Sequence, residues 1–132
     1  MKILFDTNVL ISAFLAFKKG SVCYDIIDHA VEVHNLYYTA FIIDEFKRVF
    51  KEDFHYPERL IDEFVAFITK FFTEGDTADT VEKISRDPKD NQVLADAVTN
   101  EIDVIITGDK DLLELKNYKG IKIITPRDYW KL

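Results

Sequence analysis

Acidic residues at four separated points of the sequence are placed where they could do chemistry together. Asp6 directly follows an apolar run, Lys2–Phe5, and Asp109 follows a second apolar run, Val104–Ile106, after three residues. Asp90 falls in the first turn of a helix expected over residues 87–100, and Glu45 lies on the apolar side of a helix expected over 41–50. Carboxylates gathered in one cleft repel one another unless one holds a proton or a cation joins them.

The chemistry that such a group of oxygen ligands suits best is phosphodiester hydrolysis. Carboxylates without His or Cys partners favour Mg²⁺ or Mn²⁺ over zinc. A divalent ion held in this way lowers the pKa of bound water and neutralises charge on a phosphodiester. Taken singly, each acid also has a structural explanation: Asp6, Asp90 and Asp109 as helix caps or first-turn residues, and Glu45 as a solvated helix residue. Asp87 and Asp111 stand close to two of these acids and could assist them or cap helices.

The elements that must position these acids alternate between short strands and helices. Strands are expected at Lys2–Phe5, 36–39, 80–84, Val104–Ile106 and Ile121–Ile124, and helices at 8–16, 21–31, 41–50, after Pro57, at 87–100, at Lys110–Leu113 and from Pro126. This alternation predicts a three-layer α/β/α sandwich with a central, mainly parallel sheet, formed by one domain over residues 1–132. Ligands of such sheets bind outside the carboxyl ends of the strands, which is where Asp6 and Asp109 fall.

Charge and composition limit the partners and the cellular compartment that we expect for this chain. The net charge of −7 argues against general binding to nucleic acid, because phosphate backbones are bound largely by Lys and Arg. That argument weakens if divalent cations carry the positive charge. The single cysteine, Cys23, excludes an internal disulfide, and no stretch has the length and apolarity of a membrane span or signal peptide. We therefore expect a cytoplasmic protein without a membrane partner.

Four motifs in order resemble those of the PIN-domain nucleases. Asp6-Thr7-Asn8 after an apolar strand is similar to the opening motif of that family, and Asp44-Glu45-Phe46 resembles the second motif. The stretch from Arg86 through Asp87-Pro88-Lys89-Asp90-Asn91 is similar to the third motif, and Thr107-Gly108-Asp109-Lys110-Asp111 to the fourth. The resemblance covers essentially the whole chain, and it is greatest for the toxin component of toxin–antitoxin pairs, the VapC-like proteins.

The resemblance implies a Mg²⁺- or Mn²⁺-dependent endoribonuclease that cleaves RNA with metal-activated water. It assigns catalysis and metal coordination to Asp6, Glu45, Asp90 and Asp109, and auxiliary roles to Asn8, Thr107 and Asp111. It further implies a cognate antitoxin protein as partner and a homodimer. One departure is Asp96, which falls where the family usually has a small or uncharged residue, and which faces either solvent or the acidic residues.

Basic residues beside the acidic motifs are candidates for substrate binding. We expect Arg86, Lys89 and Lys110 to rim the cleft and contact RNA phosphates. The alternative is that these residues are scattered, solvated surface charges without a role in binding.

Three other functions remain open. One is a PIN scaffold without activity that binds RNA or protein. The second is a phosphatase of the haloacid dehalogenase type, which needs a second Asp where this chain has Asn8. The third is a receiver domain, which needs paired acids after the first strand, where this chain has the single Asp6.

Overall fold

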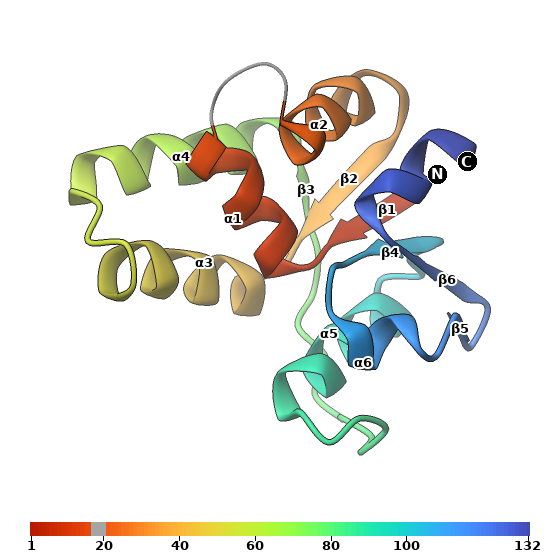
Figure 1. Cartoon of the computed structure of the whole chain (residues 1–132). Coiled ribbons are helices and arrows are strands. Elements are labelled where there is room, and N and C mark those ends of the chain that lie inside the picture. The colour runs from red at the N-terminus through yellow and green to blue at the C-terminus, as the bar shows by residue number, and fades with distance from the viewer. Residues whose placement is uncertain (17–20) are drawn as a thin grey trace.

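The computed structural model describes residues 1–16 and 21–132, which form a six-stranded sheet with helices on both faces (Figure 1). The strand order is β3-β2-β1-β4-β6-β5. All neighbouring strands are parallel except β5 and β6, which form an antiparallel hairpin. The predicted three-layer α/β/α class with a mainly parallel sheet is thereby confirmed.

The strands are short, and the two central ones, β1 and β4, are apolar except for Lys2. Their bounds are β1 Lys2–Phe5, β2 Asn35–Tyr38, β3 Thr73–Glu74, β4 Val104–Ile106, β5 Asn117–Tyr118 and β6 Ile121–Ile124. In β1, Ile3 pairs with Leu36 of β2 on one side and with Val104 of β4 on the other. Strands buried on both faces need such continuous apolar runs, which is why the sequence reveals β1 and β4 clearly.

The helices divide between the two faces of the sheet. Their bounds are α1 Thr7–Ala16, α2 Val22–Val33, α3 Ala40–Glu52, α4 Glu58–Phe71, α5 Pro88–Thr99 and α6 Lys110–Leu113, with a final 3₁₀ helix η1 at Pro126–Lys131. The connections from β1 to β2 and from β2 to β3 run toward one edge of the sheet, and their helices, α1–α4, lie on one face (Figure 1). The chain then returns from β3 to β4 on the other side of β1. Because parallel connections are right-handed, this change of direction puts α5 and α6 on the opposite face. The strand order therefore switches direction between β1 and β4, the place where parallel sheets build ligand sites.

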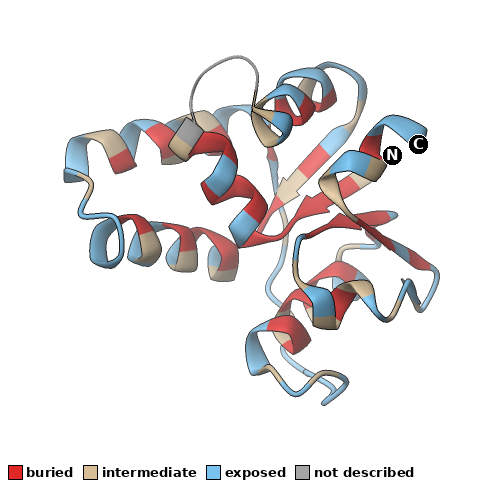
Figure 2. Cartoon of the chain, in the orientation of Figure 1, coloured by how far each residue is buried: buried red, intermediate tan, exposed pale blue. Residues whose placement is uncertain are grey.

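One apolar cluster fills the space between the sheet and its helices. The central strands and the inward sides of the helices are buried, whereas the outer helix faces are exposed (Figure 2). An aromatic group centred on Phe14 packs α1 against α3 and α4, with Phe46 at 5.6 Å and Phe64 at 5.1 Å between ring centroids. This packing fixes α3, and with it Glu45, relative to the end of β1. In the part of the chain that the structure describes, no helix is long and apolar enough to cross a membrane.

One expected strand is wrong. Residues 80–84 form no strand; the third strand is instead Thr73–Glu74. Side chains of α5 hold the segment before that helix in place: Asn91 Oδ1 accepts hydrogen bonds from the backbone N–H groups of Ile84 and Ser85, at 3.0 and 2.7 Å. Since these backbone groups are satisfied by side chains, the segment needs no neighbouring strand.

Candidate metal centre

Asp6 is fixed where β1 passes into α1. The backbone N–H of Asp6 still bonds to Ile106 of β4, so the residue continues the sheet ladder by one position. Its side chain is only 8% exposed. Oδ1 accepts the N–H of Thr7 at 2.8 Å and Oδ2 accepts the hydroxyl of Thr107 at 2.7 Å. Burial raises the pKa of Asp6, and the nearby charges of Asp109 and Glu45 add to the rise, against the lowering effect of both hydrogen bonds.

Thr107 ties the ends of the two central strands together. Besides donating to Asp6, its hydroxyl oxygen accepts the backbone N–H of Asp109 at 2.9 Å. Asp109 in turn caps α6, since its Oδ1 accepts the N–H of Asp111 at 2.8 Å. The caps that the sequence suggested as alternatives to a functional role are therefore real, and they orient the carboxylates at this edge of the sheet.

Two more aspartates come from the start of α5. Asp87 is the N-cap and accepts the N–H of Lys89 at 3.0 Å, and Pro88 occupies the first helical position, where a missing N–H costs nothing. Asp90, one turn into the helix, is 4% exposed, and its Oδ2 accepts the Ser85 hydroxyl at 3.3 Å. Burial, followed by the charges of Asp109, Asp87 and Asp6, raises the pKa of Asp90 to about 7.

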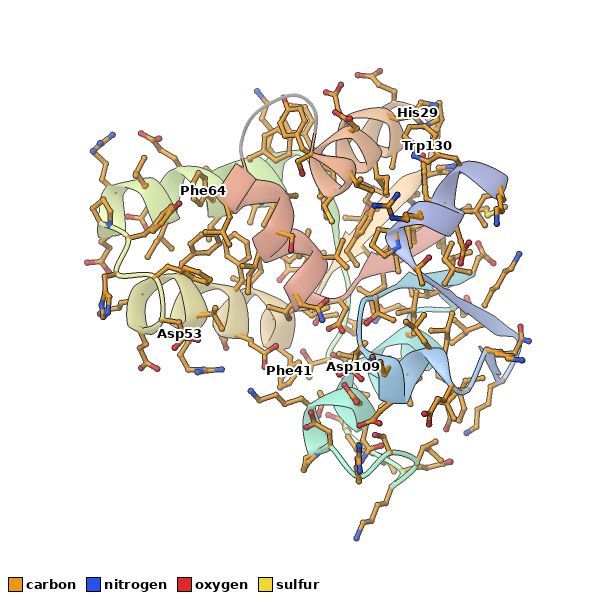
Figure 3. All side chains as sticks on the ribbon, in the orientation of Figure 1. His29, Phe41, Asp53, Phe64, Asp109 and Trp130 are labelled. Carbon is orange, nitrogen blue, oxygen red and sulfur yellow. The ribbon has the colours of Figure 1, made fainter. Side chains whose placement is uncertain are left out.

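These acids line one cavity, which we call the acidic cavity. Asp87, Asp90 and Asp109 can each offer a carboxylate oxygen within 4.8 Å of the other two. Glu45 reaches the same cavity from α3, and the full lining is Asp6, Asn8, Glu45, Asp87, Lys89, Asp90, Val93 and Asp109. Figure 3 labels Asp109 at this point, between α6 and the start of α3. The structure thus brings together Asp6, Glu45, Asp90 and Asp109, the four acids singled out in the sequence.

The donor set fits a hard divalent cation. The possible ligand atoms in the lining of the acidic cavity are carboxylate oxygens and the amide oxygen of Asn8, and no His or Cys is among the lining residues. Mg²⁺ and Mn²⁺ prefer such oxygen ligands, and Mg²⁺ needs only one or two carboxylates because it keeps several waters. Burial, and after it repulsion between the carboxylates, raises the pKa values of Asp6 and Asp90, and such an ion would relieve that repulsion.

Of the other predicted residues, Asn8 and Lys89 line the acidic cavity, and the rest lie around it. Asp111 and Arg86 face each other in an ion pair, with Arg86 Nε 3.1 Å from Oδ2, and both line a neighbouring open groove with Ser85. Lys110 is exposed at the first residue of α6. Lys89 lines the acidic cavity itself, with Nζ 3.4 Å from Glu45 Oε2. Sequence reasoning did not pair Lys89 with Glu45, and it left open whether Asp87 joins Asp90 and Asp109.

Asp96 is structural. It is fully buried and lies outside the lining of the acidic cavity. Its Oδ1 accepts the Ala78 N–H and the Gln92 amide, both at 2.8 Å, and its Oδ2 accepts the Thr39 hydroxyl at 3.2 Å. Asp96 therefore neither faces solvent nor adds a carboxylate to the acidic cavity; it anchors the segment after β3 to α5.

Replacing Asp96 with Ala should destabilise the fold strongly. The change leaves the buried Thr39 hydroxyl and the half-buried donors of Gln92 and of the Ala78 backbone without their acceptor, for which we expect a loss of roughly 3 kcal/mol in the free energy of unfolding. Urea unfolding measures this loss. Asp79→Ala, at the exposed position directly after Ala78, should change stability by less than about 0.5 kcal/mol. Equal effects of the two variants would contradict the anchoring role.

Comparison with known proteins agrees with this architecture. A family model described as PIN domain matches residues 2–111. The chain belongs to the PIN domain family. No curated protein matches the sequence.

Solved structures share the fold of this PIN domain at low sequence identity. The crystal structure of VapBC2 from Rickettsia felis bound to a DNA fragment from their promoter contains a chain with a TM-score of 0.68 and 8% identity, covering 95% of this chain and 98% of that one. A chain of FitAcB from Neisseria gonorrhoeae gives a TM-score of 0.60 and 19% identity, covering 98% of this chain and 99% of that one. At these identities the likeness shows the fold.

Thr107 gives the PIN domain a testable positioning residue. Thr107→Val keeps the shape but removes the hydroxyl that bonds to Asp6 and accepts from Asp109. Residues that orient metal ligands typically change metal affinity or activity by about 10- to 100-fold when lost. We expect Mn²⁺ affinity to fall within that range, as measured by isothermal titration calorimetry, whereas Thr107→Ser, which keeps the hydroxyl, should stay within about threefold. Unchanged affinity in Thr107→Val would show that the link does not orient the carboxylates.

Proposed function

We propose that this PIN domain is a metal-dependent endoribonuclease and the toxin of a toxin–antitoxin pair. The observation that carries the nuclease proposal is the convergence of Asp87, Asp90 and Asp109, with oxygens within 4.8 Å of one another, on a cavity also lined by Asp6 and Glu45. Carboxylates from four separate segments would not be gathered in one cavity at a switch point of the sheet for stability alone, since their mutual repulsion is costly.

We assign each residue its proposed role from its place in or beside the acidic cavity. Asp6, Glu45, Asp90 and Asp109 would hold Mg²⁺ or Mn²⁺, with Asp87 near enough to contribute. A divalent cation supplies Lewis-acid activation of water and neutralises charge on the phosphodiester when bound. Asp6 and Asp109 are oriented by Thr107, and the exposed Asn8 amide at the cavity mouth can hydrogen-bond to water or to a phosphate oxygen.

Basic groups around the acidic cavity are proposed to contact the RNA backbone. Lys89 lies in the cavity lining and Lys110 follows Asp109 directly. Arg86 is 86% exposed in its side chain although it pairs with Asp111, so its guanidinium is open to a phosphate. With a net charge of −7, the chain needs these local cations and the bound metal to attract a polyanion.

The toxin assignment rests on the sequence motifs and on fold likeness. The order of the four acidic motifs resembles VapC-like toxins, and the similar chains come from the complexes named VapBC2 and FitAcB. On that basis we propose an antitoxin protein as partner and a homodimer as the working form.

Cleavage of RNA by the purified chain tests the nuclease proposal. Labelled single-stranded RNA and total cellular RNA are incubated with Mg²⁺, with Mn²⁺ and with chelator, beside single-stranded DNA of the same sequence. We expect internal cleavage of RNA that requires either metal and stops in chelator. Folded protein that leaves all RNA intact with both metals, or that cleaves equally in chelator, would contradict the proposal and favour a PIN scaffold that only binds.

A further inference from the structure

Lys89 is placed as a cation inside an otherwise acidic lining. Among the residues that line the acidic cavity it is the single basic one, beside five carboxylates and one amide. It is the second residue of α5, between the cap residue Asp87 and the buried Asp90. Its ammonium Nζ lies 3.4 Å from Glu45 Oε2, which joins the start of α5 to α3 across the cavity.

The two partners of this ion pair differ in burial. The Glu45 side chain is 17% exposed, whereas the Lys89 side chain is 57% exposed. Glu45 is therefore fixed by the fold, and the lysine reaches in from solvent on a flexible chain of methylene groups. An ammonium on such a chain can leave a carboxylate without disturbing the helix that carries it.

A second hollow shows where the ammonium can go. Lys89 also borders a shallow hollow next to the acidic cavity, lined by Phe41, Asp44, Glu45 and Arg48. Arg48 there is itself partly exposed, with its guanidinium 3.6 Å from Glu52 of the same helix. Lys89 and Arg48 thus line the same hollow, where two cations beside the Asp44 carboxylate could hold a phosphate group.

We propose that Lys89 is a built-in counter-ion that competes with the divalent cation for Glu45. In the metal-free protein the ammonium pairs with this carboxylate; when a divalent ion binds the acidic cavity, the ammonium gives up Glu45 and becomes available to a phosphate of the substrate backbone. Lys89 thus lowers the metal affinity of the free protein and links metal binding to substrate binding. The inference rests on the proposed metal-dependent function and adds a positioning residue to it.

Metal titration without RNA tests the competition. Mn²⁺ affinity is measured by isothermal titration calorimetry for the wild-type chain, Lys89→Gln, Lys89→Arg and Lys110→Gln. Lys110 is the matched control, because it is an exposed lysine directly after Asp109 and its replacement makes the same change in net charge. We expect Lys89→Gln to bind Mn²⁺ about 5- to 10-fold more tightly, and Lys89→Arg and Lys110→Gln to stay within about twofold of wild type.

The outcomes separate this inference from the proposed function. Tighter binding in Lys89→Gln alone supports the counter-ion role. Unchanged or weaker binding in Lys89→Gln overturns it, and so does an equal gain in Lys110→Gln, which would reveal only a general charge effect; in both cases a wild-type chain that binds Mn²⁺ leaves the proposed metal centre standing. A wild-type chain with no saturable Mn²⁺ binding would overturn both.

Discussion

Asp6→Asn should reduce metal-dependent RNA cleavage by at least about 10³-fold while leaving the fold intact. The substitution removes one negative charge from the acidic cavity and replaces a carboxylate oxygen, proposed as a metal ligand, with an amide nitrogen. The fold should tolerate it, because an Asn oxygen can still accept the Thr7 N–H, and the Thr107 hydroxyl can turn to accept from the new amide. Activity is measured as the rate of RNA cleavage at saturating Mn²⁺.

Asp103→Asn is the matched control for this prediction. Asp103 directly precedes β4 and therefore lies at the opposite end of that strand from Thr107, where its Oδ2 accepts the Lys2 N–H at 2.8 Å. The same chemical change there should leave cleavage within about twofold. Circular dichroism confirms that both variants are folded. Cleavage by Asp6→Asn within tenfold of wild type would remove Asp6 from the metal centre.

Asp90→Asn should stabilise the metal-free protein above neutral pH. The pKa of Asp90 in the folded chain is about 7, whereas an Asp in an unfolded chain titrates near 4. Between these two values the folded state binds more protons than the unfolded state, so this group's contribution to stability is complete below about pH 4 and is lost as the pH rises through about 7. The raised pKa of Asp6 acts in the same direction.

The expected size is large. A shift of about 3 pKa units corresponds to roughly 4 kcal/mol at most, and we expect a gain of about 2–4 kcal/mol for Asp90→Asn at pH 8 in chelator, with little difference at pH 4. Urea unfolding at the two pH values measures the gain. Adding Mg²⁺ at pH 8 should stabilise the wild-type chain and close the gap, because the variant lacks a ligand. Asp62→Asn, on the exposed side of α4, is the surface control and should change the free energy of unfolding at pH 8 by less than about 0.5 kcal/mol. A constant difference between Asp90→Asn and wild type at both pH values would contradict the account of the acidic cavity.

Local signals in the sequence were sufficient to predict three of the elements that position the acids, β1, β4 and α5. The apolar runs of β1 and β4 and the Asp87-Pro88 start of α5 each depend on neighbouring residues only, and the structure has them at or within one residue of the predicted bounds. Strands β3 and β5 have two residues each, which is too short for an alternation of apolar and polar residues to predict them. β5 forms because Lys119 and Gly120, both with positive φ, make a two-residue turn that returns the chain onto β6.

The contacts that sequence reasoning missed join segments that are distant along the chain. Asp96 accepts hydrogen bonds from Thr39 and Ala78, and neither residue is near it in sequence. The pairing of Lys89 with Glu45 likewise joins α5 to α3. A helical pattern gives the face on which a side chain lies, but the partner is set by the packing of a second element, which the pattern does not contain.

Diffraction from crystals soaked in Mn²⁺, recorded with anomalous scattering, tests most directly whether the carboxylates hold a cation. We predict an anomalous peak in the acidic cavity within bonding distance of Asp90 and Asp109 oxygens, absent from crystals of Asp90→Asn. A peak bound only elsewhere on the chain, or none at Mn²⁺ concentrations that support RNA cleavage, would contradict the metal centre and the function proposed from it.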